Sequence, residues 1–146
     1  MTATIADEVD RALDRLRRQD AAVPEPGSML TIAEMAERTG VSAHTLRYYE
    51  RIGLLEVARD PAGHRVYGAD DFARVVFLSR LRMTGMPIRT LQRYVALVAD
   101  GEATVPERLA MLQAHRDAVR AQLQELVFAL ETVEFKIASY GGACAP

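Results

Sequence analysis

The sequence is poor in the residues that build disulfides and membrane spans. It has a single cysteine, Cys144, so no intrachain disulfide can form, which fits a reducing cytoplasm. No apolar run approaches the roughly 18 residues that a membrane-spanning helix needs. The N-terminus mixes Asp, Glu and Arg without an apolar stretch, which argues against a secretory signal. These absences favour a cytoplasmic protein without a membrane partner.

Positive charge is also scarce. The net charge is −2 and Lys136 is the only lysine, so a generic binder of polyanions is not expected. Between Ser28 and Gly68, five arginines stand against five acidic residues. Recognition of an anionic partner must therefore depend on where individual arginines lie. We expect four of them on one face, with Glu34, Glu37 and Glu56 elsewhere. Those four are Arg47, Arg51, Arg59 and Arg65.

The first 28 residues are predicted to form a helix and a linker. Thr4 and Asp7 have the spacing of a capping box, and apolar residues from Ile5 to Leu16 share one helical face. This pattern predicts a helix over Thr4–Gln19. Two prolines and a glycine mark the following residues, Asp20–Ser28, as a linker.

Two short amphipathic helices are predicted next. Thr31 and Glu34 form a capping box for the first helix, and Ser42 caps a second helix that ends near Arg51. A tight turn at Thr39–Val41 separates the two. Two such helices joined by a short turn are typical of a helix-turn-helix.

A short hairpin follows the second helix. Its predicted strands are Leu55–Arg59 and Arg65–Tyr67, and the residues between them, Asp60–Gly63, favour a turn. A helix-turn-helix with such a wing has a shape that fits the grooves of DNA.

Three further helices are predicted after the wing: Gly68 to about Thr84, Pro87 to Asp100, and Thr104 to about Ser139. Thr104 and Glu107 are interpreted as a capping box at the start of the last helix. Apolar residues at alternating spacings of three and four follow this helix, which is typical of a coiled-coil seam. The seam consists of Leu109, Leu112, Arg116, Val119, Leu123, Leu126, Leu130, Val133 and Ile137, with Arg116 the one polar member.

Nothing within the chain is long enough to pair with this seam along its whole length. A second copy is the natural partner, so the seam predicts a homodimer. The alternative is that the long helix folds back on the helix that starts at Pro87.

The segments TLRYYERIGLL (Thr45–Leu55) and GHRVY (Gly63–Tyr67) resemble the DNA-binding head of the MerR family of bacterial transcription regulators. The resemblance implies a homodimer, joined by an antiparallel coiled coil, that binds double-stranded promoter DNA between the −35 and −10 elements. It further implies that the dimer bends and untwists an overlong spacer so that RNA polymerase can use both elements.

The helix geometry and the resemblance together predict which residues contact DNA. Arg47 is expected to read a guanine edge or bind a phosphate. Tyr48 is expected to face DNA and Tyr49 to pack inward, since neighbouring helical residues point about 100° apart. His44 is either a DNA contact or a plain surface residue, and Tyr67 suits core packing as well as a phosphate contact. The full candidate set is Thr31, Ala43, His44, Arg47, Tyr48, Arg51, Arg59, Gly63, His64, Arg65 and Tyr67.

The second half of the chain resembles a particular branch of that family. The segments MTGMPIRTLQRYVALVADGEATVPER and LETVEFKIASY resemble regulators that respond to aldehyde and thiol stress. Such regulators often carry a reactive cysteine in the helix after the wing, where this chain has Arg80. Cys144 remains the one possible redox residue. The histidines and Cys144 lack the spacing of metal ligands, so no metal or other cofactor is expected.

These patterns predict a mostly α-helical transcription regulator that is not an enzyme. Its expected parts are an N-terminal extension (1–28), a winged helix-turn-helix with a helical pair (29–101), a coiled-coil helix (102–140) and a flexible tail (141–146). Two alternatives remain: an architectural DNA-binding protein without an effector, and an electrophile sensor or small enzyme that uses Cys144. No pattern identifies an inducer.

Overall fold

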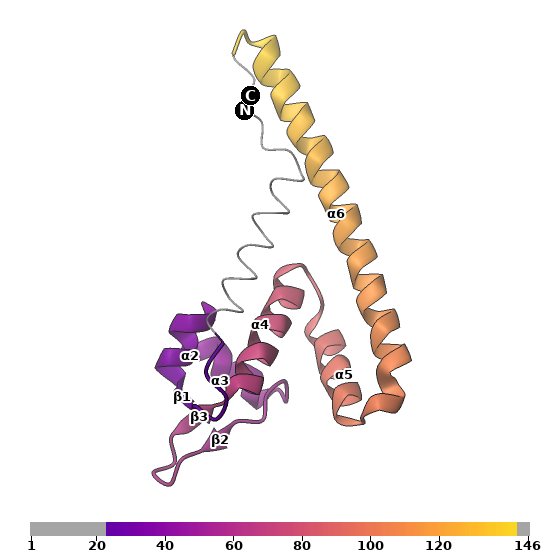
Figure 1. Ribbon diagram of the computed structural model, residues 1–146. Helices are drawn as coiled ribbons and strands as arrows, with labels where there is room; N and C mark the ends of the chain where they lie inside the picture. The colour runs from indigo at the N-terminus through magenta and orange to yellow at the C-terminus, as the bar shows by residue number, and fades with distance from the viewer. Residues whose placement is uncertain (1–22, 143–146) are drawn as a thin grey trace.

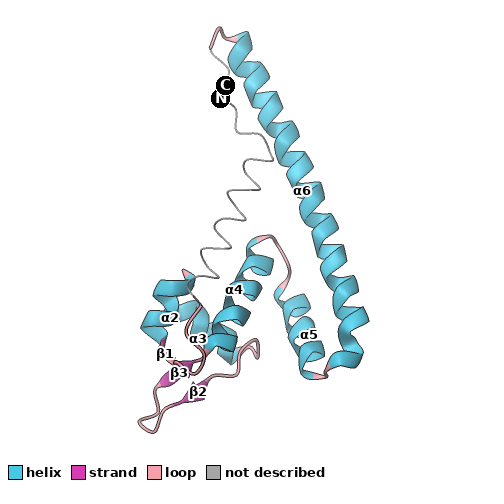
Figure 2. Ribbon diagram, in the orientation of Figure 1, coloured by secondary structure: helices cyan, strands magenta, loops and turns pink. Residues whose placement is uncertain are grey.

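The computed structural model describes residues 23–142, which are mostly helical and include one small sheet (Figure 2). A winged head lies at one end, two helices lead away from it, and one long helix carries the chain to the far end (Figure 1). The predicted helix Thr4–Gln19 and the residue Cys144 lie outside the described residues. The elements in order are β1 (Leu30–Thr31), α2 (Ile32–Thr39), α3 (Ala43–Arg51), β2 (Ala58–Arg59), β3 (Arg65–Tyr67), α4 (Ala69–Met83), α5 (Ile88–Ala99), the 3-10 turn η1 (Glu102–Thr104) and α6 (Val105–Ser139).

Local capping fixes the start of α2. The Thr31 side chain accepts a hydrogen bond from Glu34 N at 3.2 Å, and the Glu34 carboxylate accepts one from Thr31 N at 2.7 Å. This reciprocal pair is the predicted capping box, which satisfies two backbone donors that the helix leaves free. Gly40 ends α2 with a φ of 73°, a left-handed conformation that glycine adopts without strain.

The second predicted cap is also confirmed. Ser42 Oγ accepts from Thr45 N at 3.1 Å and begins α3. Met35 from α2 and Leu46 from α3 are fully buried, so the two helices pack through one aliphatic contact surface. The helix-turn-helix thus follows from two side-chain caps, one glycine and two buried apolar residues.

The sheet has three short strands, whereas a hairpin of two strands is predicted. β3 lies in the centre, and β1 and β2 pair antiparallel with it on either side. The predicted strand Leu55–Arg59 is wrong in its first half, because Leu54 N and Leu55 N donate to Tyr49 O at 2.9 and 3.4 Å and so still close the end of α3. The Leu55 side chain then enters the core. The short strand β1 was not predicted.

The helical pair extends the core of the head. Phe72, Val75 and Leu78 of α4 are buried, as their helical spacing predicts, and Leu91 of α5 is fully buried. Gln92 donates from its side-chain amide to Ile52 O at 2.9 Å. Through this bond α5 is tied to the end of α3, so the helical pair supports the position of the second helix of the head.

The predicted capping box at the start of α6 is wrong. The turn η1 precedes α6 and gives Thr104 a φ of −90° and a ψ of −2°, whereas a capping residue is extended. The Thr104 hydroxyl lies 2.5 Å from Leu97 O and 2.7 Å from Gly101 O, and Glu107 forms an ion pair with Arg93. Both side chains therefore bind α5 and its C-terminal turn instead of capping α6.

The two halves of α6 have different surroundings. The N-terminal half packs against α5, and the C-terminal half extends away from the other helices (Figure 1). In the seam, Leu112 and Val119 are half-buried, whereas all five members from Leu123 to Ile137 are exposed. No helix within residues 23–142 is both long and apolar enough to cross a membrane.

Candidate nucleic-acid interface

α3 directs its polar side chains away from the core. Tyr49 is 4% exposed, and burial raises the pKa of its hydroxyl, whereas His44, Arg47 and Arg51 are exposed. Tyr48 is half-buried, and the Arg51 guanidinium lies 5.3 Å from the centre of its ring. The inward position of Tyr49 agrees with the helical geometry, and a cation–π contact holds Arg51 along the helix surface.

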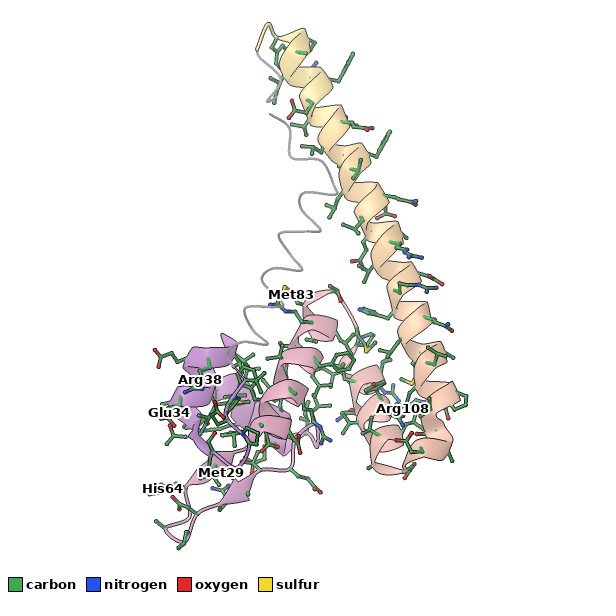
Figure 3. The ribbon with its side chains drawn as sticks, in the orientation of Figure 1. Met29, Glu34, Arg38, His64, Met83 and Arg108 are labelled. Carbon is green, nitrogen blue, oxygen red and sulfur yellow. The ribbon has the colours of Figure 1, made fainter. Side chains whose placement is uncertain are left out.

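The turn of the wing is closed by its own hydrogen bonds. Asp60 N donates to His64 O at 2.9 Å, and Asp60 Oδ1 accepts from His64 N at 2.8 Å. The bond from the His64 backbone is the largest cause of a lowered pKa at Asp60. Gly63 adopts a φ of 86°, a left-handed conformation that glycine adopts without strain and that this turn requires. His64 therefore lies on a defined turn with its side chain exposed (Figure 3).

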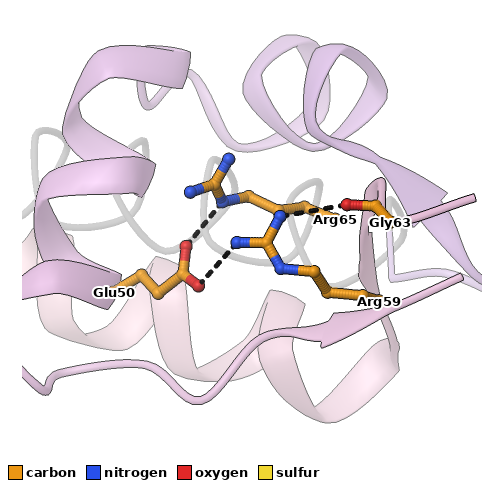
Figure 4. Close-up of polar contacts among 4 residues, drawn as sticks. All are labelled: Glu50, Arg59, Gly63 and Arg65. Atoms are coloured by element: carbon orange, nitrogen blue, oxygen red, sulfur yellow. Dashed lines mark hydrogen bonds and ion pairs between the residues drawn. The ribbon is translucent and has the colours of Figure 1, made fainter.

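The wing is joined to α3 by one carboxylate, that of Glu50. Arg65 Nε donates to Glu50 Oε2 at 2.5 Å, and Arg59 Nη2 lies 3.4 Å from Glu50 Oε1 (Figure 4). Arg59 also donates from Nη1 to Gly63 O at 3.1 Å. The bond to Glu50 raises the pKa of Arg65 above its ordinary value. These contacts hold the two wing arginines at the end of α3.

Sequence reasoning did not include Glu50 in the site. Glu50 is one of the five acidic residues between Ser28 and Gly68, and three of the others, Glu34, Glu37 and Glu56, are expected away from the arginines. Glu50 is nine residues before Arg59 and fifteen before Arg65, so no helical or strand periodicity relates them. Only the fold of the hairpin back onto α3 brings this acid between two of the arginines.

An open hollow of about 370 Å³ lies between α3 and the wing. Its lining includes Arg47 from α3 and both Arg59 and Arg65 from the wing, so three of the four arginines expected on one face do share a concave surface. Arg51 is not part of this lining. Of the eleven candidate residues, the structure brings six together around the hollow: Thr31, Arg47, Arg59, Gly63, His64 and Arg65.

Tyr67 is not available for a DNA contact, which corrects its place in the candidate set. Its side chain is fully buried among the residues of the head. Its hydroxyl has no hydrogen-bond partner among the described residues, and burial raises its pKa. The other candidates outside the hollow, Ala43, His44, Tyr48 and Arg51, lie along α3.

The seam of α6 forms a second candidate surface, suited to a protein partner. Leu123, Leu126, Leu130 and Val133 are each more than half exposed. Leu109 is also 52% exposed, and Arg116 binds the adjacent Asp117 at 3.0 Å. Met83, at the end of α4, is 68% exposed (Figure 3). These exposed apolar residues make this part of α6 a candidate contact surface.

A polar contact ties α6 to α4 at the point where the packed half ends. The ring nitrogen Nε2 of His115 lies 2.6 Å from Thr84 Oγ1, and both residues are half-buried. Within residues 23–142, no group of three or more His, Cys, Asp or Glu side chains is placed to hold a metal ion.

Two family matches divide the chain into the winged head and the helices that follow it. Residues 31–67 match the family described as MerR family regulatory protein, and residues 72–133 match the one described as MerR, DNA binding. The first match covers the helix-turn-helix and wing, and the second begins in α4 and ends within the exposed half of α6.

Relatives extend this similarity over most of the chain. An uncharacterized HTH-type transcriptional regulator of Haemophilus influenzae is 36% identical, covering 79% of this chain and 86% of the relative. The HTH-type transcriptional regulator AdhR of Bacillus subtilis is 38% identical over 60% of this chain, which spans 63% of AdhR. The crystal structure of HiNmlR, a MerR family regulator lacking the sensor domain, bound to promoter DNA, superposes with a TM-score of 0.75. The two sequences are 35% identical, and the alignment covers 78% of this chain and 87% of the HiNmlR chain.

Proposed function

The chain belongs to the MerR family of transcription regulators, and on that premise we propose that it binds promoter DNA with α3 in the major groove and the wing along the sugar-phosphate backbone. The observation that carries this proposal is the hollow in which Arg47, Arg59 and Arg65 meet. Guanidinium groups from two elements around one concavity fit a duplex that presents base edges to a helix and phosphates to the flanking hairpin.

The proposal assigns different tasks to the candidate residues. Arg47, His44 and Tyr48 lie on α3, where base edges and nearby phosphates are met. Arg59, Arg65 and their turn lie in the wing, where a contact with phosphates adds affinity without sequence information. HiNmlR, a relative of similar fold, is bound to promoter DNA in its crystal structure, which supports promoter DNA as the partner.

We further propose that the protein acts as a homodimer. The exposed half of the seam repeats apolar residues in heptad positions over Leu123–Ile137, and the described part of the chain places nothing against it. The N-terminal half of α6 does fold back on α5, as the alternative interpretation expects, but the C-terminal half does not. A second copy, antiparallel to the first, would cover the remaining half and fix the separation of the two heads.

The regulatory step would follow from this geometry. Two heads at a fixed separation bind two half-sites, and a separation that differs from the relaxed promoter spacing deforms the DNA between them. Bending or untwisting an overlong spacer would present both promoter elements to RNA polymerase. An architectural protein without an effector would bind in the same way but leave transcription unchanged.

One experiment tests the proposal in two stages. The full chain is used to select duplexes from a randomised pool, and the selected duplex is footprinted and placed in a promoter spacer for transcription in vitro with bacterial RNA polymerase. The expected result is a two-fold symmetric protected sequence and a changed transcript level. Failure to enrich any sequence would refute DNA recognition, and enrichment without a change in transcription would favour the architectural alternative.

A further inference from the structure

The position of Glu50 raises a physical question about the proposed DNA interface. A carboxylate lies between two arginines that would meet phosphates, and DNA repels a carboxylate. The Glu50 side chain is 23% exposed, against 27% for Arg65 and 46% for Arg59, so the three charged groups lie partly out of solvent. An acid at this place lowers the general attraction of the head for any polyanion.

The geometry of the contacts shows what the acid contributes instead. Glu50 receives Arg65 through Nε alone, which leaves both terminal nitrogens of that guanidinium without a hydrogen-bond partner among the described residues. Those two nitrogens form the end of the guanidinium fork that can bind a phosphate bidentately. Glu50 therefore holds the base of the Arg65 fork and leaves its end available.

The contact with Arg59 fixes the turn of the wing. Arg59 Nη2 reaches Glu50 while its Nη1 donates to Gly63 O, so one side chain links the end of α3 to the turn that carries His64 (Figure 4). The wing strands β2 and β3, of two and three residues, pair at only two positions and supply few backbone hydrogen bonds of their own. Glu50 thus joins the turn of the wing to α3, in addition to the pairing of β3 with β1 that holds the base of the wing.

We propose that Glu50 is a positioning residue that sets the wing arginines at a fixed distance and angle from α3, so that the head binds its target sequence selectively and other DNA weakly. This inference rests on the proposed function. The repulsion from phosphates weakens binding to every sequence alike. The orientation favours duplexes whose backbone passes the wing while α3 reads its bases, and this second effect separates a selective head from a merely basic one.

The test replaces the carboxylate by its neutral isostere, Glu50→Gln, in the full chain. The matched control is Glu37→Gln, which removes the same charge from an exposed site on α2. For wild type and both variants, fluorescence anisotropy measures affinity for a duplex that the wild-type protein selects from a randomised pool. The same titration with a scrambled duplex of equal composition measures non-specific affinity, at several salt concentrations.

Glu50→Gln is expected to raise affinity for the scrambled duplex about two- to eight-fold at 0.1 M salt and to steepen its salt dependence, as one further phosphate contact would. Affinity for the selected duplex should stay level or fall, so the ratio of selected to scrambled affinity falls at least about two-fold. Glu37→Gln should leave the ratio unchanged. In an Arg65→Ala background, Glu50→Gln should have less effect on the ratio, because one of the positioned side chains is already missing.

Each other outcome overturns the inference in a recognisable way. An unchanged ratio in Glu50→Gln, with only a lower melting temperature, would make Glu50 a stabilising residue. An equal fall in Glu37→Gln would assign the effect to net charge. If the wild-type chain selects no sequence at all, the proposed function itself fails, and the inference fails with it.

Discussion

The winged head and the long helix of this protein are stable for different reasons. The head encloses a core in which Met35, Leu46, Leu54, Tyr67 and Leu91 are fully buried. α6, by contrast, has no buried residue along its 35 positions, and its seam residues beyond Val119 face solvent. The head therefore encloses its core within a single copy, whereas no other helix within residues 23–142 covers the exposed half of α6. The difference supports the proposed division of roles, in which the head binds DNA and α6 joins two copies.

The largest expected effect is the loss of assembly by a charge in the seam. Leu126 is 67% exposed in the single chain, and Leu126→Asp would bury a carboxylate against apolar residues of a second copy. Light scattering should report a monomer. Affinity for the selected duplex should fall about 100-fold or more, because two linked heads bind as a unit, while circular dichroism of the head is retained.

Phe135→Asp is the matched control for this prediction. Phe135 is 76% exposed on the same helix, nearly opposite the seam, so the variant should remain dimeric. A dimeric Leu126→Asp variant would place the interface elsewhere.

A cavity in the head is expected to have the reverse effect: the head loses stability while the dimer persists. Leu46 is fully buried, so Leu46→Ala should lower the free energy of unfolding by about 2–5 kcal/mol. Urea denaturation at a fixed protein concentration measures the change, and light scattering should still report a dimer. Glu56→Ala, an exposed substitution in the same head, should change stability by about 0.5 kcal/mol or less. Dissociation of Leu46→Ala under native conditions would show that head and seam depend on each other.

A smaller effect is expected from removing single arginines, and it should differ between α3 and the wing. Arg47→Ala should weaken binding to the selected duplex by about 1–3 kcal/mol and affect scrambled DNA less. Arg65→Ala should weaken both and reduce the magnitude of the salt slope by about 0.9. Arg38→Ala, on the exposed surface of α2 (Figure 3), removes the same charge away from the hollow and serves as the control. Affinities of both variants equal to that of Arg38→Ala would remove them from the interface.

The smallest effect concerns the cap of α2. The hydrogen bond from Thr31 N holds the pKa of Glu34 below its ordinary value. The stability linked to Glu34 is therefore present above the unfolded-state pKa, about 4.3, and is lost as pH falls through the lower folded-state pKa. Melting temperature should decline over this window in the wild type. In Glu34→Gln the decline should be shallower, and identical pH profiles would show that the cap adds no pH dependence.

Local features of this fold could be predicted from sequence, and features made by distant contacts could not. The caps at Thr31 and Ser42 depend on residues three positions away, so both were confirmed. The cap at Thr104 was wrong because that hydroxyl binds Leu97 across a turn. The short strand at Leu30 exists only through pairing with Tyr67, which no local pattern reveals.

The candidate site shows the same limit. Arg47, Arg59 and Arg65 were identified from residue type, helix position and family resemblance, and the fold gathers them around one hollow. The sequence allows Tyr67 either core packing or a phosphate contact, and its full burial places it in the core. Glu50 was missed because its role depends on the wing folding back onto α3. The DNA contacts themselves and the dimer seam remain predictions.

In the proposed dimer, the unbroken helix α6 would let the distance between the two heads change only by whole residues of helix. A helix of 35 residues is about 52 Å long, and each residue adds about 1.5 Å and a rotation of about 100°. One residue inserted after Val119 would turn the exposed seam away from the side that the packed half presents. Seven inserted residues would nearly restore the direction and lengthen the helix by about 10 Å. In such a dimer, only helix lengths that differ by whole heptads would keep the seam in register. The head separation, and with it the promoter spacing that the dimer can bind, would therefore take only a few discrete values.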